Sequence, residues 1–333
     1  MAVGRRIVVV GAGSIGKRHI RLLRERKGAQ VEVTEPNPDA LASLRAEFGA
    51  LVVHDSFEAM LDTHPEVVWL ASPTALHAVQ SIAALNAGAH VFCEKPMAYT
   101  VEEARNVSEV AARSSRIFNV GFYLHFSIGM LLLKEMIERG DLGSLLHIRA
   151  HVGSYITLVN SISRYQTRHA GALFFDYSHQ PDLFYWLTKK MPTTLQVYGF
   201  CGGAMQLTAD PNVADVICEY DSHLITHVHL NYAQMPERHT YEVIGDEGWA
   251  FLDFNEGLVL VGNRRQQTVQ TKTFRQDRDD IFRAEHNAFF DAVEGRRSPE
   301  TSAADGLIST MICAAALESY RTKRKVPPLT PRI

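Results

Sequence analysis

The stretch at residues 7–16, IVVVGAGSIG, constrains the fold of this chain more than any other part of it. A run of β-branched residues leads directly into a Gly-x-Gly-x-x-Gly motif, which predicts a buried strand that turns through glycines into a helix. In such a turn Gly11 permits the sharp bend, Gly13 lets the backbone approach a pyrophosphate, and Gly16 lets the helix pack against the strand. The N-terminus of that helix then faces the phosphates. The sequence therefore predicts a nucleotide site here, in preference to an ordinary glycine-rich turn.

The segment after the first helix bears on which nucleotide is bound. Residues 31–34 alternate as a second strand, and Glu35 follows at its tip, about 20 residues beyond the glycines. An acid at this position can bond the ribose hydroxyls of the adenosine and repels a 2′-phosphate. We therefore expect NAD, with NADP less favoured. The alternatives are that Glu35 is an exposed loop acid, and that Arg45 or Lys27 accommodates a phosphate.

Strands and helices alternate through the rest of the first third of the chain. Strand-like runs occur at residues 51–53, 67–71, 90–93 and 117–120, with helix-like segments at residues 38–48, 75–87 and from residue 100 onward. This alternation predicts an α/β fold with a parallel, doubly wound (Rossmann) sheet, whose ligands lie at the carboxyl ends of its strands. We assign residues 1–122 to this dinucleotide-binding domain.

Two short segments lie at such strand ends, SPT at residues 72–74 and EKP at residues 94–96. Thr74 can cap the helix that follows it. Lys95 would point into the crevice at the edge of the sheet, where a lysine can take part in catalysis. The commoner role of an isolated lysine, a surface cation beside a loop proline, is the alternative.

The character of the sequence changes after Gly121. Strand-like segments follow one another with little helix between them, at residues 145–152, 195–200, 213–220, 224–232, 241–244 and 250–254. They predict a mostly antiparallel open sheet with one face buried and the other facing a site. We assign residues 123–333 to a C-terminal α+β domain for substrate binding and oligomerisation. The polar run at residues 263–280 is expected to be an exposed hairpin and linker.

The segment at residues 170–187 is densely apolar but contains two acids and a histidine. Burying these polar groups without partners would be unfavourable. Asp176 and His179 are close enough in sequence to share a site at a helix start, where an acid can orient an imidazole and raise its basicity. Asp182 can equally be a structural acid of that helix. A hydrogen-bonded core histidine is the alternative for His179.

Composition excludes several classes of function. The net charge of −3 argues against a chain that binds phosphate polymers, and the basic residues between Lys17 and Lys27 read as a solvated helix face. No cysteine pair has CxxC spacing and no stretch approaches membrane-spanning length, so we expect a cytoplasmic protein without export or membrane anchoring. Histidines recur on the strand-like segments without the cysteine or carboxylate pattern of a metal site, so we expect no metal. These histidines are His147, His151, His227 and His229.

Several of these motifs, in this order, resemble those of the glucose-fructose oxidoreductase/inositol dehydrogenase/MocA family of NAD(P)-dependent sugar oxidoreductases. Residues 11–16 are similar to its nucleotide loop, and residues 72–77 to its segment near the nicotinamide. Residues 94–96 look like its Glu-Lys-Pro signature, and residues 171–187 like its glycine, aspartate, histidine and aspartate segment before a Trp-Leu helix. The resemblance spans essentially the whole chain and includes the turn at residues 244–248.

The resemblance implies that Lys95, Asp176 and His179 are the catalytic set. His179 would act as the base for the hydroxyl proton while hydride leaves carbon, and Lys95 would bond the substrate oxygen and relay or donate a proton. Two departures from the family pattern occur. Asp176 and His179 are three residues apart where four is commoner, a form associated with a branch acting on sugars or sugar nucleotides. His125 stands where the family often has arginine.

The motifs and the resemblance together predict the ligand contacts. The cofactor is expected to contact Gly11, Gly13, Ser14, Ile15, Gly16, Glu35, Ser72, Pro73, Thr74, His77, Glu94 and Lys95. The substrate is expected to contact Lys95, His125 and His179, together with Tyr155, Arg164, Tyr165 and Arg168 from the loop before the catalytic segment. That loop is a polar and aromatic mixture suited to a polyol or an anionic group, although it can also be merely an exposed lid.

The function we predict is an NAD-dependent oxidoreductase that transfers hydride between a nicotinamide cofactor and a secondary alcohol or ketone of a sugar, cyclitol or sugar nucleotide. Two alternatives come with the family. One is a glycosidase that uses NAD in transient oxidation and elimination, and the other is a non-catalytic dinucleotide-binding regulator. Because the exposed face of an antiparallel sheet is a common place for subunits to meet, we expect a homodimer or homotetramer. From the net charge, we expect no nucleic-acid partner.

Overall fold

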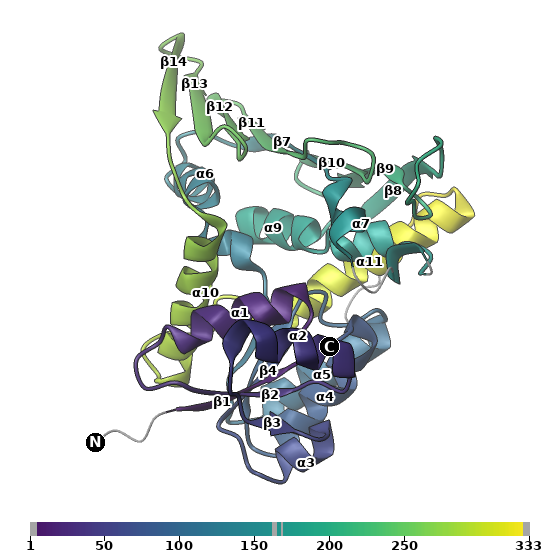
Figure 1. Cartoon of the computed structure of the whole chain (residues 1–333). Coiled ribbons are helices and arrows are strands. Elements are labelled where there is room, and N and C mark those ends of the chain that lie inside the picture. Colours follow the sequence, from purple (N-terminus) through teal and green to yellow (C-terminus); the bar gives the residue numbers. More distant parts are fainter. Residues whose placement is uncertain (1–4, 162–164, 168, 329–333) are drawn as a thin grey trace. The chain divides into compact units, whose positions relative to one another are not determined.

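The structure is a computed structural model that describes residues 5–161, 165–167 and 169–328, and the chain divides into two compact units (Figure 1). Unit 1 takes in the chain up to Tyr123 together with Arg278–Thr310. Unit 2 takes in Leu124–Asp277 and the chain from Met311 onward. The chain therefore passes between the units after residues 123, 277 and 310, and a segment far along the sequence completes unit 1.

Unit 1 is built on a six-stranded parallel sheet with the order β3-β2-β1-β4-β5-β6. Its strands are β1 Arg6–Val10, β2 Gln30–Thr34, β3 Val53–His54, β4 Val67–Leu70, β5 His90–Glu94 and β6 Phe118–Gly121. Strand β1 pairs with β2 on one side and with β4 on the other, so the strand order reverses at β1. The predicted doubly wound fold is confirmed, and its switch point is the edge at which such sheets bind nucleotides.

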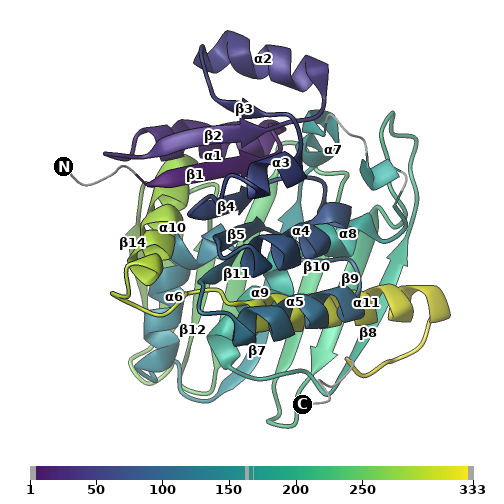
Figure 2. The ribbon, with the colours of Figure 1, turned by 90° about the horizontal axis from the view of Figure 1, so that it is seen from below.

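Helices cover both faces of this sheet (Figure 2). They are α1 Ser14–Arg24, α2 Pro38–Phe48, α3 Phe57–Leu61, α4 Thr74–Asn86, α5 Val101–Arg113 and α10 Arg278–Val293. Because side chains alternate along a strand, β1 places Val8 in the core with α3, α4 and α5, and Val9 in the core with α1, α2 and α10. In the second core Trp69 stacks on Phe92, with ring centroids 3.8 Å apart.

Helix α10 also contacts some of the basic residues between Lys17 and Lys27. Arg21 pairs with Asp279 at 2.6 Å, and Arg18 pairs with the same carboxylate at 3.2 Å. The guanidinium of Arg26 lies over the ring of Phe290, 4.2 Å from its centroid. The expected solvated face is present at Arg24 and Lys27, which are exposed, whereas other basic residues also contact a helix more than 250 residues away in sequence.

Unit 2 is built on an eight-stranded sheet with the order β14-β13-β12-β11-β7-β10-β9-β8. Its strands are β7 Leu145–Gly153, β8 Thr194–Phe200, β9 Val213–Glu219, β10 Ile225–Asn231, β11 Arg238–Gly245, β12 Gly248–Asp253, β13 Leu258–Asn263 and β14 Thr268–Thr273. Strands β7 and β10 run parallel, and all other neighbours are antiparallel. The predicted mostly antiparallel sheet is confirmed.

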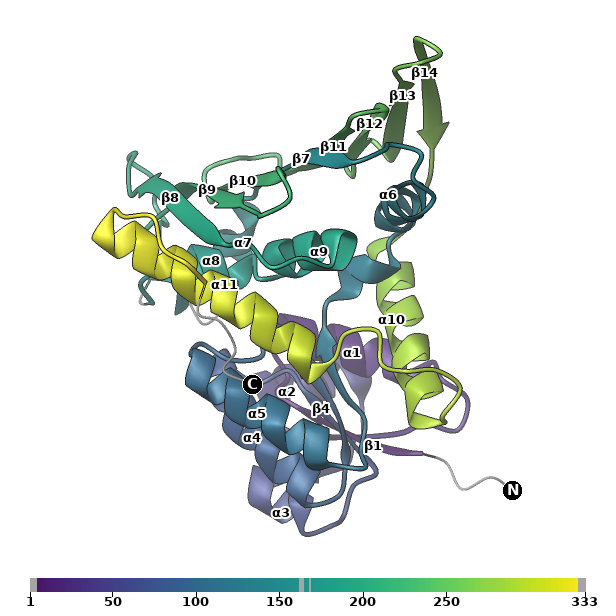
Figure 3. The same cartoon turned by 180° about the vertical axis from the view of Figure 1, so that it is seen from behind.

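The helices of unit 2 lie on one face of its sheet. They are α6 Ile128–Glu138, α7 Ile156–Asn160, α8 Ala172–Asp176, α9 His179–Thr188 and, from Met311 onward, α11 Ala303–Thr322, with 3-10 turns η1 Tyr123–Phe126 and η2 Tyr165–Thr167. Figure 3 shows α6, α9 and the end of α11 along this face. Strands β9 and β10 alternate between buried side chains on that face and partly exposed ones on the other. The predicted open face is therefore present.

The polar run at residues 263–280 forms most of the expected hairpin and linker. Strand β14 pairs with β13, and all six of its residues are exposed. The last residues of the run instead open α10, which begins at Arg278. Within the described part of the chain, no helix is long and apolar enough to cross a membrane.

Helix α1 packs closely against the turn that follows β1. A Cβ added at Gly16 would lie 2.1 Å from the carbonyl oxygen of Gly11, which is backbone and has no freedom to move away. We expect Gly16→Ala to lower the free energy of unfolding by about 1–3 kcal/mol, because overpacking displaces the helix from the strand. Denaturant unfolding followed by circular dichroism measures this.

Gly13→Ala is the matched control, because a Cβ there meets no atom within 4 Å and the backbone φ is −67°. Equal stability of the two variants would contradict the close-packing account of Gly16.

Candidate active site

The glycine loop of unit 1 leaves the N-terminus of α1 open. Gly13 is the N-cap residue, no side chain caps the helix, and its first turn contains no acid. Gly13 and Ser14 are exposed, and Ile15 is partly exposed. The first N–H groups of a helix carry partial positive charge and need acceptors, which a phosphate supplies. These residues therefore fit the pyrophosphate of a dinucleotide.

Glu35 lies at the end of β2, beside the same loop. One of its carboxylate oxygens accepts a hydrogen bond from Ala12 N at 2.6 Å, and the other accepts from Asn37 N at 2.8 Å. Each carboxylate oxygen has two lone pairs, so acceptor capacity remains for ribose hydroxyls. The backbone thus fixes an anionic acceptor next to the glycine loop.

The turn between β4 and α4 is tied to the loop after β5 by His77. This fully buried ring lies with Nε2 2.8 Å from the Ser72 carbonyl and Nδ1 2.8 Å from the Pro96 carbonyl. Burial lowers the pKa of His77, while the two carbonyls act in the opposite direction. Pro73 is the N-cap of α4 and its ring carries no capping group, so Thr74 is the first helical residue and not the predicted cap.

The loop after β5 carries Glu94 and Lys95. Burial by itself would raise the pKa of Glu94, but hydrogen bonding to His19 and the nearby positive charge of Lys95 bring it below its ordinary value. One oxygen of Glu94 lies 2.7 Å from His19 Nε2, and the other accepts from Lys95 N at 3.1 Å. Lys95 is partly exposed, and its backbone N–H lies next to this buried carboxylate.

In unit 2, His179 opens helix α9 and is 7% exposed. Its ring centroid lies 6.2 Å from that of His239, whose pKa burial lowers to about 3. His239 Nε2 lies 3.0 Å from the hydroxyl of Tyr241, which donates to Gln180 Oε1 at 2.7 Å. His179 therefore lies near a histidine that is part of a hydrogen-bonded chain with Tyr241 and Gln180.

Asp176 ends helix α8, just before His179. Its Oδ2 accepts hydrogen bonds from the hydroxyl of Tyr232 and, at 3.2 Å, from Gln166 Nε2. These donors come from β10's end and from the loop before the segment, so Asp176 connects three parts of unit 2. That Asp176 orients His179 stays a prediction.

Two of the other polar residues form a buried pair. His125 Nε2 lies 2.6 Å from Asp182 Oδ2, and both side chains are at most 2% exposed. The His125 ring packs on Trp186, with centroids 4.4 Å apart. Asp182 thus has a side-chain partner, and whether its role is structural stays a prediction. Whether His125 also contacts the substrate stays a prediction.

The loop before the catalytic segment is only partly described. Tyr155 precedes α7, and its hydroxyl accepts from Leu207 N at 3.3 Å. Tyr165 begins η2 and is partly exposed. Arg164 and Arg168 lie outside the described residues. The predicted substrate contacts of this loop therefore stay predictions.

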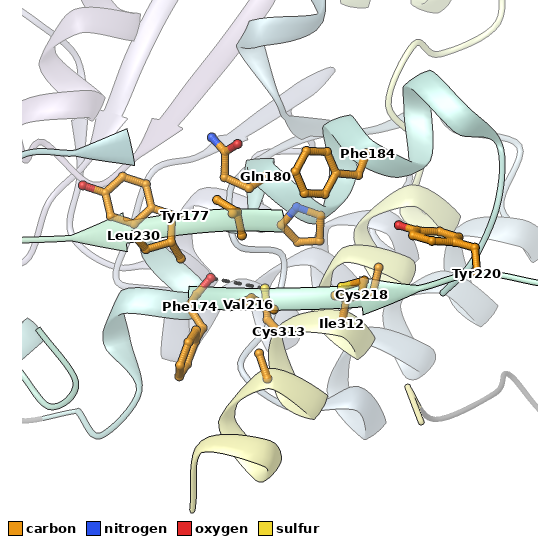
Figure 4. A pocket seen from close by; sticks show the side chains of 13 residues that line it. Phe174, Tyr177, Gln180, Phe184, Val216, Cys218, Tyr220, Leu230, Ile312 and Cys313 are labelled. Atoms are coloured by element: carbon orange, nitrogen blue, oxygen red, sulfur yellow. Dashed lines mark hydrogen bonds between the residues drawn. The ribbon is translucent and has the colours of Figure 1, made fainter. Parts of the chain in front are cut away.

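A pocket lies between α9, α11 and strands β9 and β10 (Figure 4). Phe184 and Val216 line it together with Cys218 and Cys313, and the Cys313 thiol donates to the Phe174 carbonyl at 3.3 Å. Burial raises the pKa of Cys218 to about 12, so its thiol is not reactive at neutral pH. An apolar lining does not suit a polyol, so this pocket is not the predicted substrate site.

Histidines on the other face of the sheet are held by hydrogen bonds. His227 Nε2 and His229 Nδ1 lie 2.8 and 2.9 Å from the same oxygen of Asp215. His151 Nε2 lies 2.8 Å from Gln234 Oε1. Across the described residues, no group of three or more histidines, cysteines or acids is arranged to hold a metal ion.

Comparison with known proteins places these features in a family. Residues 5–122 match the model described as "Oxidoreductase family, NAD-binding Rossmann fold", and residues 130–251 match the GFO/IDH/MocA C-terminal domain. Inositol 2-dehydrogenase 3 of Saccharopolyspora erythraea is 29% identical over 97% of this chain and 95% of its own. Inositol 2-dehydrogenase/D-chiro-inositol 3-dehydrogenase of Lacticaseibacillus casei is 28% identical over 96% and 94%.

Solved structures share the fold. The scyllo-inositol dehydrogenase of Lactobacillus casei, with bound NAD(H) and scyllo-inositol, superposes with a TM-score of 0.84 and 23% identity, covering 98% of this chain and 99% of its own. The WlbA dehydrogenase of Bordetella pertussis, in complex with NADH and UDP-GlcNAcA, gives a TM-score of 0.81 and 21% identity over 98% and 99%.

The open space at Gly13 leads to a prediction about binding. A methyl group there meets no protein atom, but it would occupy the place where a pyrophosphate approaches the backbone. We expect Gly13→Ala to weaken NADH binding about tenfold or more, as a lost charge-assisted hydrogen bond does, with unfolding unchanged. NADH fluorescence titration measures the Kd, and wild-type affinity in this variant would contradict the assignment of the loop.

Proposed function

Since the chain belongs to the GFO/IDH/MocA family of oxidoreductases with an NAD-binding Rossmann fold, we propose that it is a cyclitol or sugar dehydrogenase. The proposed reaction transfers hydride between NAD and a secondary alcohol or ketone, with an inositol as the first substrate to test. The observation that carries this proposal is the similarity to inositol 2-dehydrogenases along nearly the whole length of both chains. No observation favours the glycosidase or the regulator.

In the proposed reaction, His179 takes the hydroxyl proton, since an imidazole titrates near neutral pH. The amine of Lys95 donates a hydrogen bond to the same oxygen and stabilises the negative charge that develops there. The cofactor, when bound, supplies the nicotinamide ring that accepts or returns hydride. The hydrogen bonds from Tyr232 and Gln166 to Asp176 hold that carboxylate in place before α9.

Glu35 supports the preference for NAD over NADP. Its carboxylate is fixed by two backbone N–H groups next to the glycine loop, where adenosine ribose is expected. A 2′-phosphate brought to this place would meet a negative charge held at short range. The alternative partners for the 2′-phosphate of NADP are Lys27 and Arg45. Both of these residues are exposed.

The open face of the unit 2 sheet is the proposed contact between copies of the chain. Large apolar side chains are exposed at the edge strand β8, Tyr198 at 58% and Phe200 at 61%. Sheets with one helix-free face commonly bury it against a second subunit. A homodimer or homotetramer and a cytoplasmic location stay predictions.

The roles of His179 and Lys95 can be tested by substitution. We expect His179→Ala and Lys95→Ala each to lower kcat by roughly 10²- to 10⁴-fold, because each removes a proton-transfer or charge-stabilising group. NADH absorbance with a panel of inositols, polyols, aldoses and nucleotide-linked sugars first identifies the substrate and then measures the variants.

The controls are His64→Asn and Lys190→Ala, which replace exposed residues of the same types. NADH binding should survive in all four variants. Full activity of both His179→Ala and Lys95→Ala would refute the assignment, and NADH binding without turnover of any compound would favour the regulator.

The role of Glu35 predicts a change in cofactor selectivity. We expect Glu35→Ala to lower kcat/KM for NAD by about tenfold to a hundredfold, since a hydrogen bond to a charged group contributes about 1.5–3 kcal/mol. The ratio of kcat/KM for NAD to that for NADP should fall, because the repulsion of the 2′-phosphate is removed. Glu35→Gln, which keeps the acceptor but not the charge, separates the two effects, and an unchanged ratio in both variants would exclude Glu35 as the selectivity residue.

A further inference from the structure

A chain of buried hydrogen bonds runs within unit 1 from α10 to the backbone of Lys95. His286 Nε2 lies 2.9 Å from His19 Nδ1, and His19 Nε2 lies 2.7 Å from one oxygen of Glu94. The other oxygen of Glu94 accepts from Lys95 N at 3.1 Å. All three residues are buried, with exposed fractions of 1% for His286, 0% for His19 and 6% for Glu94. Residues from two helices therefore hold one carboxylate at the end of β5.

The surroundings of His19 are aromatic. Its ring centroid lies 5.2 Å from that of Trp69, 5.6 Å from that of Phe92 and 5.4 Å from that of Phe282. A polar atom buried in such a place is unfavourable without a partner, and each nitrogen of His19 has one. Because an ionised carboxylate can only accept, His19 Nε2 carries the proton of its bond to Glu94. His19 therefore donates to Glu94 through Nε2, and a rotated ring would not keep both hydrogen bonds.

Strand β6 closes the other side of the carboxylate. A Cβ added at Gly121 would lie 3.1 Å from both Cδ and Oε1 of Glu94, and 3.2 Å from Oε2. These distances are tighter than ordinary van der Waals contact, so the Glu94 side chain fills the space above the glycine. The carboxylate is therefore fixed by hydrogen bonds from one side and by packing from the other.

We propose that His19 and His286 are positioning residues for Lys95, which they act on through Glu94. Glu94 fixes the backbone N–H of Lys95, and His77 Nδ1 lies 2.8 Å from the carbonyl oxygen of the next residue, Pro96. The proposal rests on the proposed function in one respect, that the Lys95 amine acts in the reaction. Residues of α1 and α10 would thereby hold the loop that follows β5 in place.

The proposal predicts how much kcat should change when His19 is substituted. A displacement of a catalytic group by about 1 Å can lower the rate about 10²-fold. We expect His19→Ala to lower kcat about tenfold to a hundredfold with little change in the Kd for NADH, because the glycine loop and Glu35 are untouched. His19→Gln should recover most of the loss, since its amide N–H can donate to Glu94 from a similar position.

A second measurement, of amide hydrogen exchange, reports directly on the loop that contains Lys95. The Lys95 amide hydrogen, which is bonded to Glu94, should exchange with solvent faster in His19→Ala than in wild type, measured by NMR or mass spectrometry. Gly121→Ala should have the same two effects, because it displaces the carboxylate from the β6 side and leaves both histidines in place. If His19→Ala does not fold, Gly121→Ala and His286→Gln carry the test.

The matched control is His90→Gln. His90 is also a buried histidine of unit 1, lies at the opposite end of β5, and accepts its own hydrogen bond from Ile117 N at 3.0 Å. It should change neither kcat nor the exchange of the Lys95 amide. A loss of kcat in His90→Gln as large as the loss in His19→Ala would reduce the role of His19 to general stability and overturn the proposal.

The two readouts separate this proposal from the proposed function. If Lys95→Ala is inactive but His19→Ala and Gly121→Ala leave both kcat and amide exchange unchanged, the positioning proposal is wrong and the proposed function stands. If Lys95→Ala is fully active while amide exchange still responds to His19→Ala, the hydrogen-bond chain holds the loop but the catalytic role of Lys95 is wrong.

Discussion

Helix α1 approaches β1 so closely that position 16 has no room for a side chain, and most of the chemistry of unit 1 depends on that contact. The approach brings the uncapped helix N-terminus to the edge where the strand order reverses. It also sets Ala12 N against the carboxylate of Glu35. One turn further along the same face of the helix, His19 enters the aromatic core and reaches Glu94. A single packing contact therefore serves both the cofactor loop and the loop of Lys95.

The sequence predicted those parts of the fold whose signals are local. The glycine motif after a β-branched run, and the alternation of strands and helices, need only neighbouring residues to be interpreted. The helix expected from residue 100 onward is α5, and the Thr100–Glu103 capping box at its start is a signal of the same local kind. What the sequence could not predict is pairing at long range, such as α10 against α1 or the parallel pairing of β7 with β10. Patterns within one segment do not specify its partner segment.

The same distinction applies to the candidate site. An acid or histidine inside an apolar segment shows that a polar partner is needed, as at Asp182, but not that the partner is His125, 57 residues away. His19 had no such signal, because it follows the glycine motif within a stretch dominated by basic residues. Its partner His286 lies 267 residues further along. Lys95 and His179 could be proposed as catalytic residues because each stands in a recognisable motif, whereas the residues around them are defined only by the folded chain.

Glu285, the neighbour of His286, shows why Glu94 is the charged acid of this region. Both are buried acids of unit 1, and each negative charge disfavours the other. Burial, with the charge of Glu94 as a second cause, raises the pKa of Glu285 well above its ordinary value. No hydrogen-bond donor among the described residues contacts the Glu285 carboxyl oxygens, whereas Glu94 accepts from His19 and from Lys95 N. Two adjacent buried carboxylates cannot both ionise at low energy, so the donors decide which one does, and they place the negative charge at the start of the Lys95 loop.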